Sequence, residues 1–258
     1  MTVACQPRRA VPTMPTLVLR SARRTHRGHV RANNEDSAAA RDAAGLYCVA
    51  DGLGGQPGGE VASRLAVAEV LKALHARSDE AAGAAFRLAA AEAHDELTAY
   101  GERHPDMWGL GTTLTALRYA GGSTAQVLHV GDSRAYRYRR GVLEPLTSDH
   151  SVVFELVRSG QLTREQARVH PRANLVTQCV GGGGDAPIPD LHEVELEPGD
   201  RLLLATDGLT DMVPEAVIAA LCGEHEDRRA LADALVAAAL AYGGRDNITL
   251  IVIDVFTA

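Results

Sequence analysis

Residues 46–60 read LYCVADGLGGQPGGE, an apolar run followed by one aspartate and then by a cluster of glycines. Aspartate is disfavoured in strands and is costly to bury without a partner. The apolar run predicts a short buried strand over residues 46–50, which places Asp51 at the point where the chain leaves a sheet. Residues 60–76 then space their apolar side chains as an amphipathic helix does.

The same arrangement recurs further along the chain, so that four aspartates stand at the ends of apolar strands: Asp51, Asp132, Asp207 and Asp246. A single one is usually a turn former or a helix cap. Strand ends of a packed sheet lie near one rim, where converging carboxylates repel one another unless cations neutralise them. Oxygen donors without Cys or His favour Mg²⁺ or Mn²⁺ over Zn²⁺. The small Gly52 lets the backbone approach such an ion and donate a carbonyl.

A second group of polar residues lies in RGHVRANNEDS, residues 27–37. Arg31 precedes the adjacent acids Glu35 and Asp36. Arginine binds phosphate through two parallel hydrogen bonds, which lysine cannot do. Alone, Arg31 is an ordinary surface residue, but beside carboxylates that hold metal ions it indicates a phosphoryl substrate.

The remaining pattern predicts an α+β fold. Three β-rich stretches follow one another closely at residues 112–120, 124–130 and 133–147, and short connections of this kind suit antiparallel hairpins. Helices are expected at residues 80–100, 214–222 and 226–242, and a last strand at 247–255. Strands supported by helices at separate places in the chain favour α+β layering over a βαβ parallel sheet. No repeat or long linker occurs, which favours a single domain at 20–258 after a flexible tail at 1–19.

Composition excludes several classes of protein. The 258 residues are 46% hydrophobic with a net charge of -7, which suits a globular domain with a large core and disfavours a nucleic-acid partner. No apolar run approaches the roughly 18 residues of a membrane span. The four cysteines form no C-x-x-C pair and follow no secretory leader, so we expect a reduced, cytoplasmic protein. A monomer is the default expectation.

Seven motifs occur together in order: VRANNEDS, VADGLGGQPGGEVAS, GLGTTLTAL, HVGDSRAYRYRRG, LTSDHS, ATDGLTDMV and GGRDNITLIVI. With them the sequence resembles, over about residues 20–256, the metal-dependent protein serine/threonine phosphatases of the PP2C type, the PPM family, in their short bacterial form. The resemblance implies a four-layer α-β-β-α sandwich of two antiparallel sheets flanked by helices. It also implies hydrolysis of phosphoserine and phosphothreonine in proteins, reversing a bacterial Ser/Thr kinase.

The resemblance also implies roles for individual residues. Asp51 would bridge two ions, the Gly52 carbonyl would bind one of them, and Asp207 with Asp246 would hold the other. A third, weaker ion would lie near Asp132, with Asp207 helping. The family's remaining site positions match Arg31, which would bind the substrate phosphate, and Glu35 and Asp36, which would act through metal-bound waters.

In this family a water that bridges the two ions attacks phosphorus directly, with no phosphoenzyme. The sequence departs from the eukaryotic pattern at Leu53, where those enzymes carry a histidine thought to protonate the leaving group. Leucine donates no proton, so a metal-bound water is the candidate acid. Residues 149–180 match the family's flap, for which we expect a role in substrate selection.

Other interpretations of single features are weaker. A dinucleotide-binding G-x-G-x-x-G frame from Gly52 places Pro57 at the last glycine, and no Walker lysine exists. His150 of the DHS motif is expected to be structural. Three further acids stand in turn or cap contexts and are expected to serve there: Asp149, Asp200 and Asp211. Two other functions stay open, a hydrolase of small phosphate metabolites and a non-catalytic signalling module on this fold.

Overall fold

A computed structural model describes residues 16–53, 58–78, 80, 82–163, 166–167 and 169–258. Two five-stranded antiparallel sheets form its centre. The first contains, in spatial order, β1 (Leu17–His26), β12 (Ile248–Thr257), β11 (Arg201–Ala205), β7 (Arg134–Arg139) and β8 (Val142–Pro145). The second contains β10 (Asp190–Glu195), β6 (Thr124–Val130), β5 (Leu114–Arg118), β3 (Leu46–Asp51) and β2 (Asp36–Arg41). A short pair is formed by β4 (Gly111–Thr112) and β9 (Val180–Gly181).

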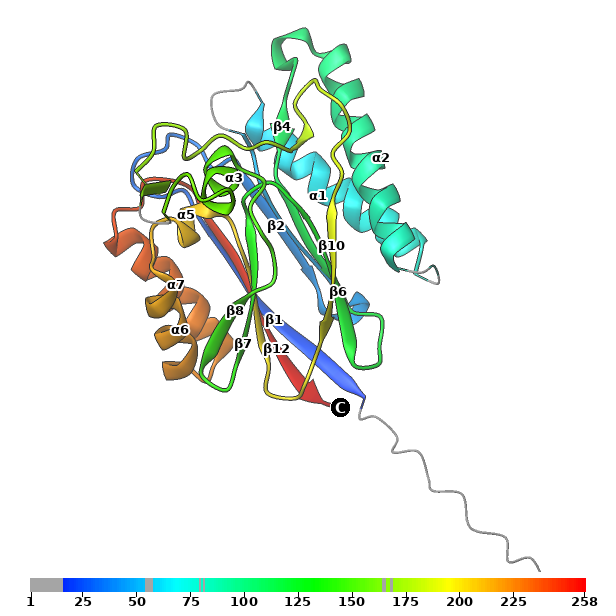
Figure 1. Cartoon of the computed structure of the whole chain (residues 1–258). Helices are drawn as coiled ribbons and strands as arrows, with labels where there is room; N and C mark the ends of the chain where they lie inside the picture. The colour runs from blue at the N-terminus through cyan, green and yellow to red at the C-terminus, as the bar shows by residue number, and fades with distance from the viewer. Residues whose placement is uncertain (1–15, 54–57, 79, 81, 164–165, 168) are drawn as a thin grey trace, which may run out of the picture.

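Helices cover the outer face of each sheet (Figure 1). The second sheet is covered by α1 (Gly59–Ala76) and α2 (Ala82–Arg103), and the first by α5 (Asp207–Thr210), α6 (Glu215–Glu224) and α7 (Arg228–Ala241). The structure also contains two 3-10 turns, η1 (Asp42–Ala44) and η2 (Pro105–Met107), and the short α3 (Val152–Arg158). The predicted four-layer α-β-β-α sandwich is therefore confirmed.

Three apolar clusters fill the three spaces between the four layers. The strand β12 shows how one strand serves two of them, because Ile251 and Ile253 face the other sheet while Leu250 and Val252 face the helices. Side chains alternate between the two faces of a strand, so a central strand buried on both faces is apolar without interruption. This explains the continuous apolar run that closes the sequence.

Two boundaries differ from the sequence-based expectations. The first strand begins at Leu17, and Leu17 and Leu19 are buried against the facing sheet, so the predicted end of the tail at residue 19 is too late. Residues 1–15 of the expected tail lie outside the described residues. Within the β-rich stretch at 133–147 the structure adds a boundary, because β7 and β8 form a hairpin that turns at Arg140 and Gly141, which both have positive φ.

Candidate metal centre

The strand ends bring the predicted acids to one rim of the sandwich, where β3 and β11 end and β12 begins. Asp51 is the last residue of β3, and Asp36, the first of β2, is its cross-strand partner. Asp207 begins α5 two residues after β11. Asp132 lies in the crossing from β6 of one sheet to β7 of the other, and Asp246 precedes β12. The four strand-end aspartates therefore lie at one rim, as the sequence predicted.

Neighbouring threonines fix the backbone at Asp51. Its amide donates to Thr113 Oγ1 at 2.9 Å, and its carbonyl accepts from Thr113 N at 2.9 Å and from Thr112 Oγ1 at 2.7 Å. Thr113 Oγ1 lies 2.7 Å from Ser133 Oγ, which follows Asp132. The two strand ends that carry Asp51 and Asp132 are therefore joined by a short chain of hydrogen bonds.

Gly52 occupies a position that only glycine fits. A Cβ there would lie 2.2 Å from the carbonyl oxygen of Gly59 and 2.8 Å from that of Glu35. Its amide donates to the Glu35 carbonyl at 3.1 Å. The start of α1 and the residue before β2 are therefore packed directly against the backbone that follows Asp51.

The rim carboxylates raise one another's pKa. Burial raises the pKa of Asp51 well above its usual range, and the charges of Asp36, Asp207 and Asp132 raise it further. The pKa of Asp207 is likewise raised by burial and by Asp132, Asp211 and Asp246. Burial raises the pKa of both Asp36 and Asp132 to about 7. Buried like charges at one place call for positive charge there.

The donor set fits a hard divalent cation. Every candidate ligand is an oxygen, and Asp36 Oδ1 and Asp207 Oδ1 are buried without a hydrogen-bond partner. Among the residues that the structure describes, no group of three or more Asp, Glu, His or Cys side chains stands, as arranged here, where it could hold a metal ion. The carboxylates are brought to this rim by the ends of β3, β6 and β11 and by the start of β12.

Arg31 and Asp246 meet at the outer side of the rim. Arg31 Nη2 lies 2.5 Å from Asp246 Oδ2, and this hydrogen bond together with the negative charges of Asp207 and Asp51 raises the pKa of Arg31. The guanidinium is half exposed, and it is the only predicted site residue that brings positive charge. Its position beside the carboxylates suits binding of a phosphate anion.

Glu35 lies at the same rim with its backbone fully engaged. Its carbonyl accepts from Ser63 Oγ at 2.6 Å as well as from Gly52 N, and its amide donates to Asn247 Oδ1 at 2.7 Å. Burial raises the pKa of Glu35, and nearby Arg31 lowers it. The structure thus brings all eight predicted site residues to one rim.

Sequence reasoning missed Asn247, which holds the loop that carries Arg31. Its amide nitrogen donates to the carbonyls of Arg27 and Asn33, each at 2.9 Å, and its side-chain oxygen accepts from Glu35 N. Asn247 is buried and spans more than 200 residues of sequence in these contacts. The only signal in the sequence was its place after Asp246 in the RDN motif.

Arg134 gives Asp149 and Asp211 a role that their turn-like contexts did not predict. Arg134 donates to both carboxylate oxygens of Asp149 at 2.8 and 2.7 Å and to Asp211 at 3.0 Å. This ion-pair group joins the start of β7, the first residue of the expected flap and the end of α5. It therefore connects the segments that hold Asp132 and Asp207.

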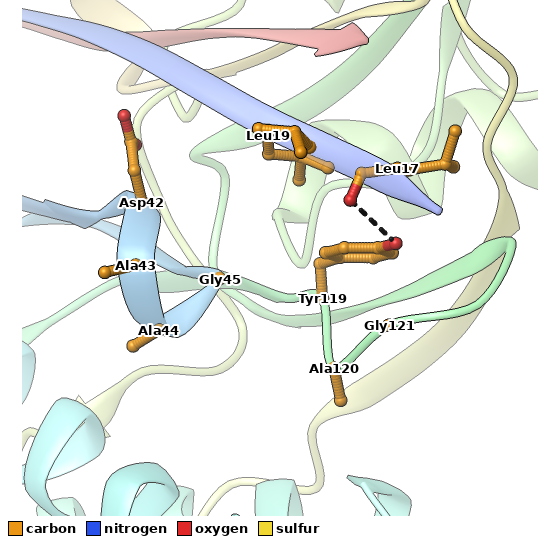
Figure 2. A pocket seen from close by; sticks show the side chains of 10 residues that line it. Leu17, Leu19, Asp42, Ala43, Ala44, Gly45, Tyr119, Ala120 and Gly121 are labelled. Atoms are coloured by element: carbon orange, nitrogen blue, oxygen red, sulfur yellow. Dashed lines mark hydrogen bonds between the residues drawn. The ribbon is translucent and has the colours of Figure 1, made fainter. Parts of the chain in front are cut away.

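Two pockets among the described residues lie away from the rim. A cavity of about 350 Å³ opens at the other end of the strands, between the start of β1, η1 and the turn after Tyr119 (Figure 2). Another, of about 370 Å³, is lined by residues 176–179, 181–182 and 184–188. Neither pocket is lined by a predicted site residue, and the rim is identified from its charged side chains.

The chain also resembles known proteins along most of its length. The family described as Protein phosphatase 2C matches residues 23–239. Serine/threonine protein phosphatase PstP of Mycobacterium tuberculosis is 41% identical over 244 residues, covering 93% of this chain and 46% of PstP, so this chain spans less than half of that relative. Serine/threonine phosphatase stp of Listeria monocytogenes is 37% identical, covering 90% of this chain and 94% of that protein.

Solved structures agree with these relatives. The catalytic domain of PstP, solved in complex with two manganese ions, is 40% identical, covers 93% of this chain and 99% of its own, and superposes with a TM-score of 0.82. The match covers both sheets and the helices on each side of them. With a family match over most of its length and relatives above 30% identity, this chain belongs to the protein phosphatase 2C family.

Proposed function

We propose that this protein is a metal-dependent protein serine/threonine phosphatase that hydrolyses phosphoserine and phosphothreonine. The observation that carries the proposal is the group of buried carboxylates at one rim, which raise one another's pKa beside the half-exposed Arg31. Family membership and the relatives named as serine/threonine phosphatases support the same activity.

The rim residues divide into two roles. Asp51, the Gly52 carbonyl, Asp207 and Asp246 would hold two Mn²⁺ or Mg²⁺ ions, and Asp132 with Asp207 would hold a weaker third. When bound, the two ions supply an activated water for direct attack on phosphorus and neutralise charge on the phosphoryl group. The manganese-bound structure of PstP supports this choice of metal.

The other site residues bind and orient the substrate. Arg31, which pairs with Asp246 in this structure, would donate two hydrogen bonds to the phosphate oxygens, and Asp246 would then hold the metal. Asn247 fixes the loop on which Arg31 stands, so the guanidinium keeps its place while substrate is absent. Glu35 and Asp36 accept hydrogen bonds from waters at the site and hold them in position.

Leu53 places an apolar side chain where the eukaryotic relatives carry a proton donor. Its amide donates to the Gly111 carbonyl at 3.0 Å, which fixes the residue beside the short β4–β9 pair. The proton for the leaving group therefore comes from water at the site and not from residue 53. A solvent isotope effect near unity on a slow leaving group would speak against this.

Partners and location follow from the same activity. The substrates are phosphorylated proteins, and a cognate Ser/Thr kinase supplies them. Residues 17–258 act as one domain, a monomer in the cytoplasm, with the flap at 149–180 beside the rim. Within the described part of the chain, no helix is long and apolar enough to cross a membrane.

The decisive experiment is hydrolysis of a phosphothreonine peptide by the purified protein, with Mn²⁺, with EDTA and with Asp207→Asn. We expect turnover that needs the metal and that collapses in the variant. A parallel assay with nucleotides tests the alternative of a small-metabolite hydrolase, which would prefer them to the peptide. Folded, manganese-loaded protein without any turnover would indicate a non-catalytic module instead.

A further inference from the structure

His150 lies where three segments meet. Its backbone amide donates to the Gly131 carbonyl at 2.7 Å, and its own carbonyl accepts from Thr177 N at 2.7 Å. The next residue, Ser151, pairs with Val176 in an isolated antiparallel bridge. The two ends of residues 149–180, the flap, are thus joined to each other and to the turn before Asp132 at one residue.

The imidazole of His150 adds two contacts on either side. Gly131 N donates to Nδ1 at 3.3 Å, which leaves the ring proton on Nε2, and Nε2 then donates to Asp190 Oδ2 at 3.2 Å. The ring is largely buried, with 11% of its side chain exposed, and stands 4.9 Å from the ring of His129. His150 therefore connects the flap to β6 and to the start of β10.

The Gly131–Asp132 turn, which His150 contacts, is packed closely against Thr113 and has little room to move. Gly131 has φ of 102°, and a Cβ there would lie 2.6 Å from Thr113 Cγ2. Thr113 also accepts the amide of Asp51. A shift at Gly131 therefore moves Asp132 directly and disturbs the residue that fixes Asp51.

We propose that His150 is a positioning residue, which uses its two ring nitrogens to hold the flap and the Gly131–Asp132 turn in one fixed arrangement. Its effect on metal binding rests on the proposed function, because that function makes Asp132 a ligand. Its effect on the flap does not. This assigns a specific role to a side chain for which the sequence predicted only a structural one.

Nearby contacts show why loss of the ring need not unfold this region. Asp149 keeps its paired hydrogen bonds to Arg134, and the backbone bonds of His150 do not depend on its side chain. Ser151 also caps α3 by accepting from Phe154 N at 3.2 Å. Removing the ring should loosen the flap and leave its connection to the sheets in place.

The first arm of the test is limited trypsin cleavage in EDTA, which needs no activity. The flap offers the exposed sites Arg158 and Arg172, and cleavage is followed by mass spectrometry. For His150→Ala we expect about tenfold faster cleavage at these sites, the scale of one or two lost hydrogen bonds. The matched control is His225→Ala, which loses one ring contact to the Leu221 carbonyl on α6.

The second arm separates the two ring contacts. His150→Asn keeps an acceptor near Nδ1 for the Gly131 amide, while His150→Gln keeps a donor near Nε2 for Asp190. Binding of Mn²⁺ is measured by titration calorimetry, and KM and kcat on the phosphothreonine peptide are measured beside it. We expect His150→Asn to bind the weakest Mn²⁺ ion nearly as the unaltered protein does, and His150→Gln to bind it as weakly as His150→Ala.

The outcomes decide between positioning and simple stability. Faster flap cleavage with an unchanged thermal midpoint, together with the split between Asn and Gln, supports the proposal. Equal behaviour of all three variants, unchanged flap cleavage, or faster cleavage throughout the molecule with a lowered midpoint overturns it. A protein without phosphatase activity would still give the cleavage result, which does not depend on the metal, so the effect on the flap and the proposed function fail separately.

Discussion

Aspartates at the two ends of the sandwich have opposite surroundings. At the rim, Asp51 ends β3, is partly buried, and has its pKa raised by burial and by three other carboxylates. At the other end of the strands, Asp42 follows β2 and accepts from Ser21 N at 3.1 Å and from Ser21 Oγ at 2.6 Å. Both aspartates stand at strand ends, so sequence position alone does not separate them.

The difference lies in whether charge and hydrogen bonding are satisfied locally. The cavity beside Asp42 is bordered by Leu17, Leu19 and Tyr119, and Tyr119 Oη donates to the Leu17 carbonyl at 3.3 Å (Figure 2). A carboxylate whose two oxygens already have protein donors has a structural role. Carboxylates that raise one another's pKa and leave buried oxygens unpaired are arranged for a ligand.

The largest expected effect is loss of activity at the rim. Asp51→Asn removes the predicted bridging ligand, and kcat/KM on the phosphothreonine peptide should fall by about 10³-fold or more, the scale of one charge-stabilising group in phosphoryl transfer. Steady-state kinetics with excess Mn²⁺ measure it. Asp233→Asn, which alters an exposed pair with Arg24, should keep full activity. Retained activity in Asp51→Asn would show that the rim aspartates, like Asp42 at the other end of the sandwich, are not needed for catalysis.

The next effect concerns pH and the buried His129 behind the rim. Burial and the neighbouring His150 lower the pKa of His129 to about 4. A histidine with a lowered folded-state pKa contributes stability above its unfolded value near 6.5, and that contribution is lost as pH falls towards 4. His129→Leu should abolish this loss, which amounts to about 3 kcal/mol by the size of the shift.

Because the rim carboxylates have raised pKa values, they act in the opposite direction over the same pH window. The measurement is therefore the difference in unfolding free energy between the two proteins at pH 7.5 and 4.5, from urea denaturation in EDTA. A difference that does not change with pH would show that His129 titrates normally in the folded protein.

Much of the fold was predictable because its signals are local. The apolar runs before Asp51 and Asp207 predicted strands, the spacing over 60–76 predicted α1, and short connections predicted antiparallel pairing. The pairing of β10 with β6 was not predictable, since about 60 residues including the flap lie between them. Such pairing is decided by burial across the whole sheet and not by local preference.

The candidate site divides in the same way. The four aspartates Asp51, Asp132, Asp207 and Asp246 were found from their strand ends, and Glu35 and Asp36 from their place after Arg31. Asn247 and Arg134 were missed because their role depends on partners elsewhere in the sequence. Asn247, near the C-terminal end of the chain, donates to the carbonyls of Arg27 and Asn33 near the N-terminal end. Arg134 joins Asp149 to Asp211. Both side chains hold segments of the site in place, and these contacts are visible only in the three-dimensional structure. Residue-level roles at the rim remain predictions.

At the other end, Asp42→Asn tests the structural half of the comparison. An amide cannot accept both Ser21 bonds with a charged carboxylate's strength, and one donor on the edge strand β1 is left weakly paired. We expect a loss of about 2 kcal/mol in unfolding free energy. Phosphatase activity of the folded protein should stay unchanged. Urea denaturation gives the first quantity, and lost activity at full folding would contradict the assignment.

The smallest expected effect is a change in unfolding free energy at the rim, opposite in sign to that of Asp42→Asn. Burial and neighbouring acids raise the pKa of Asp207, so its charge at pH 8 opposes folding, and Asp207→Asn should stabilise the protein in EDTA by about 1 kcal/mol. With excess Mn²⁺ the order should invert, because the unaltered protein gains the free energy of metal binding. Thermal unfolding of both proteins under both conditions measures this. The same Asp→Asn change then destabilises one end and stabilises the other, and equal signs in EDTA would mean that the rim carboxylates are satisfied without a cation.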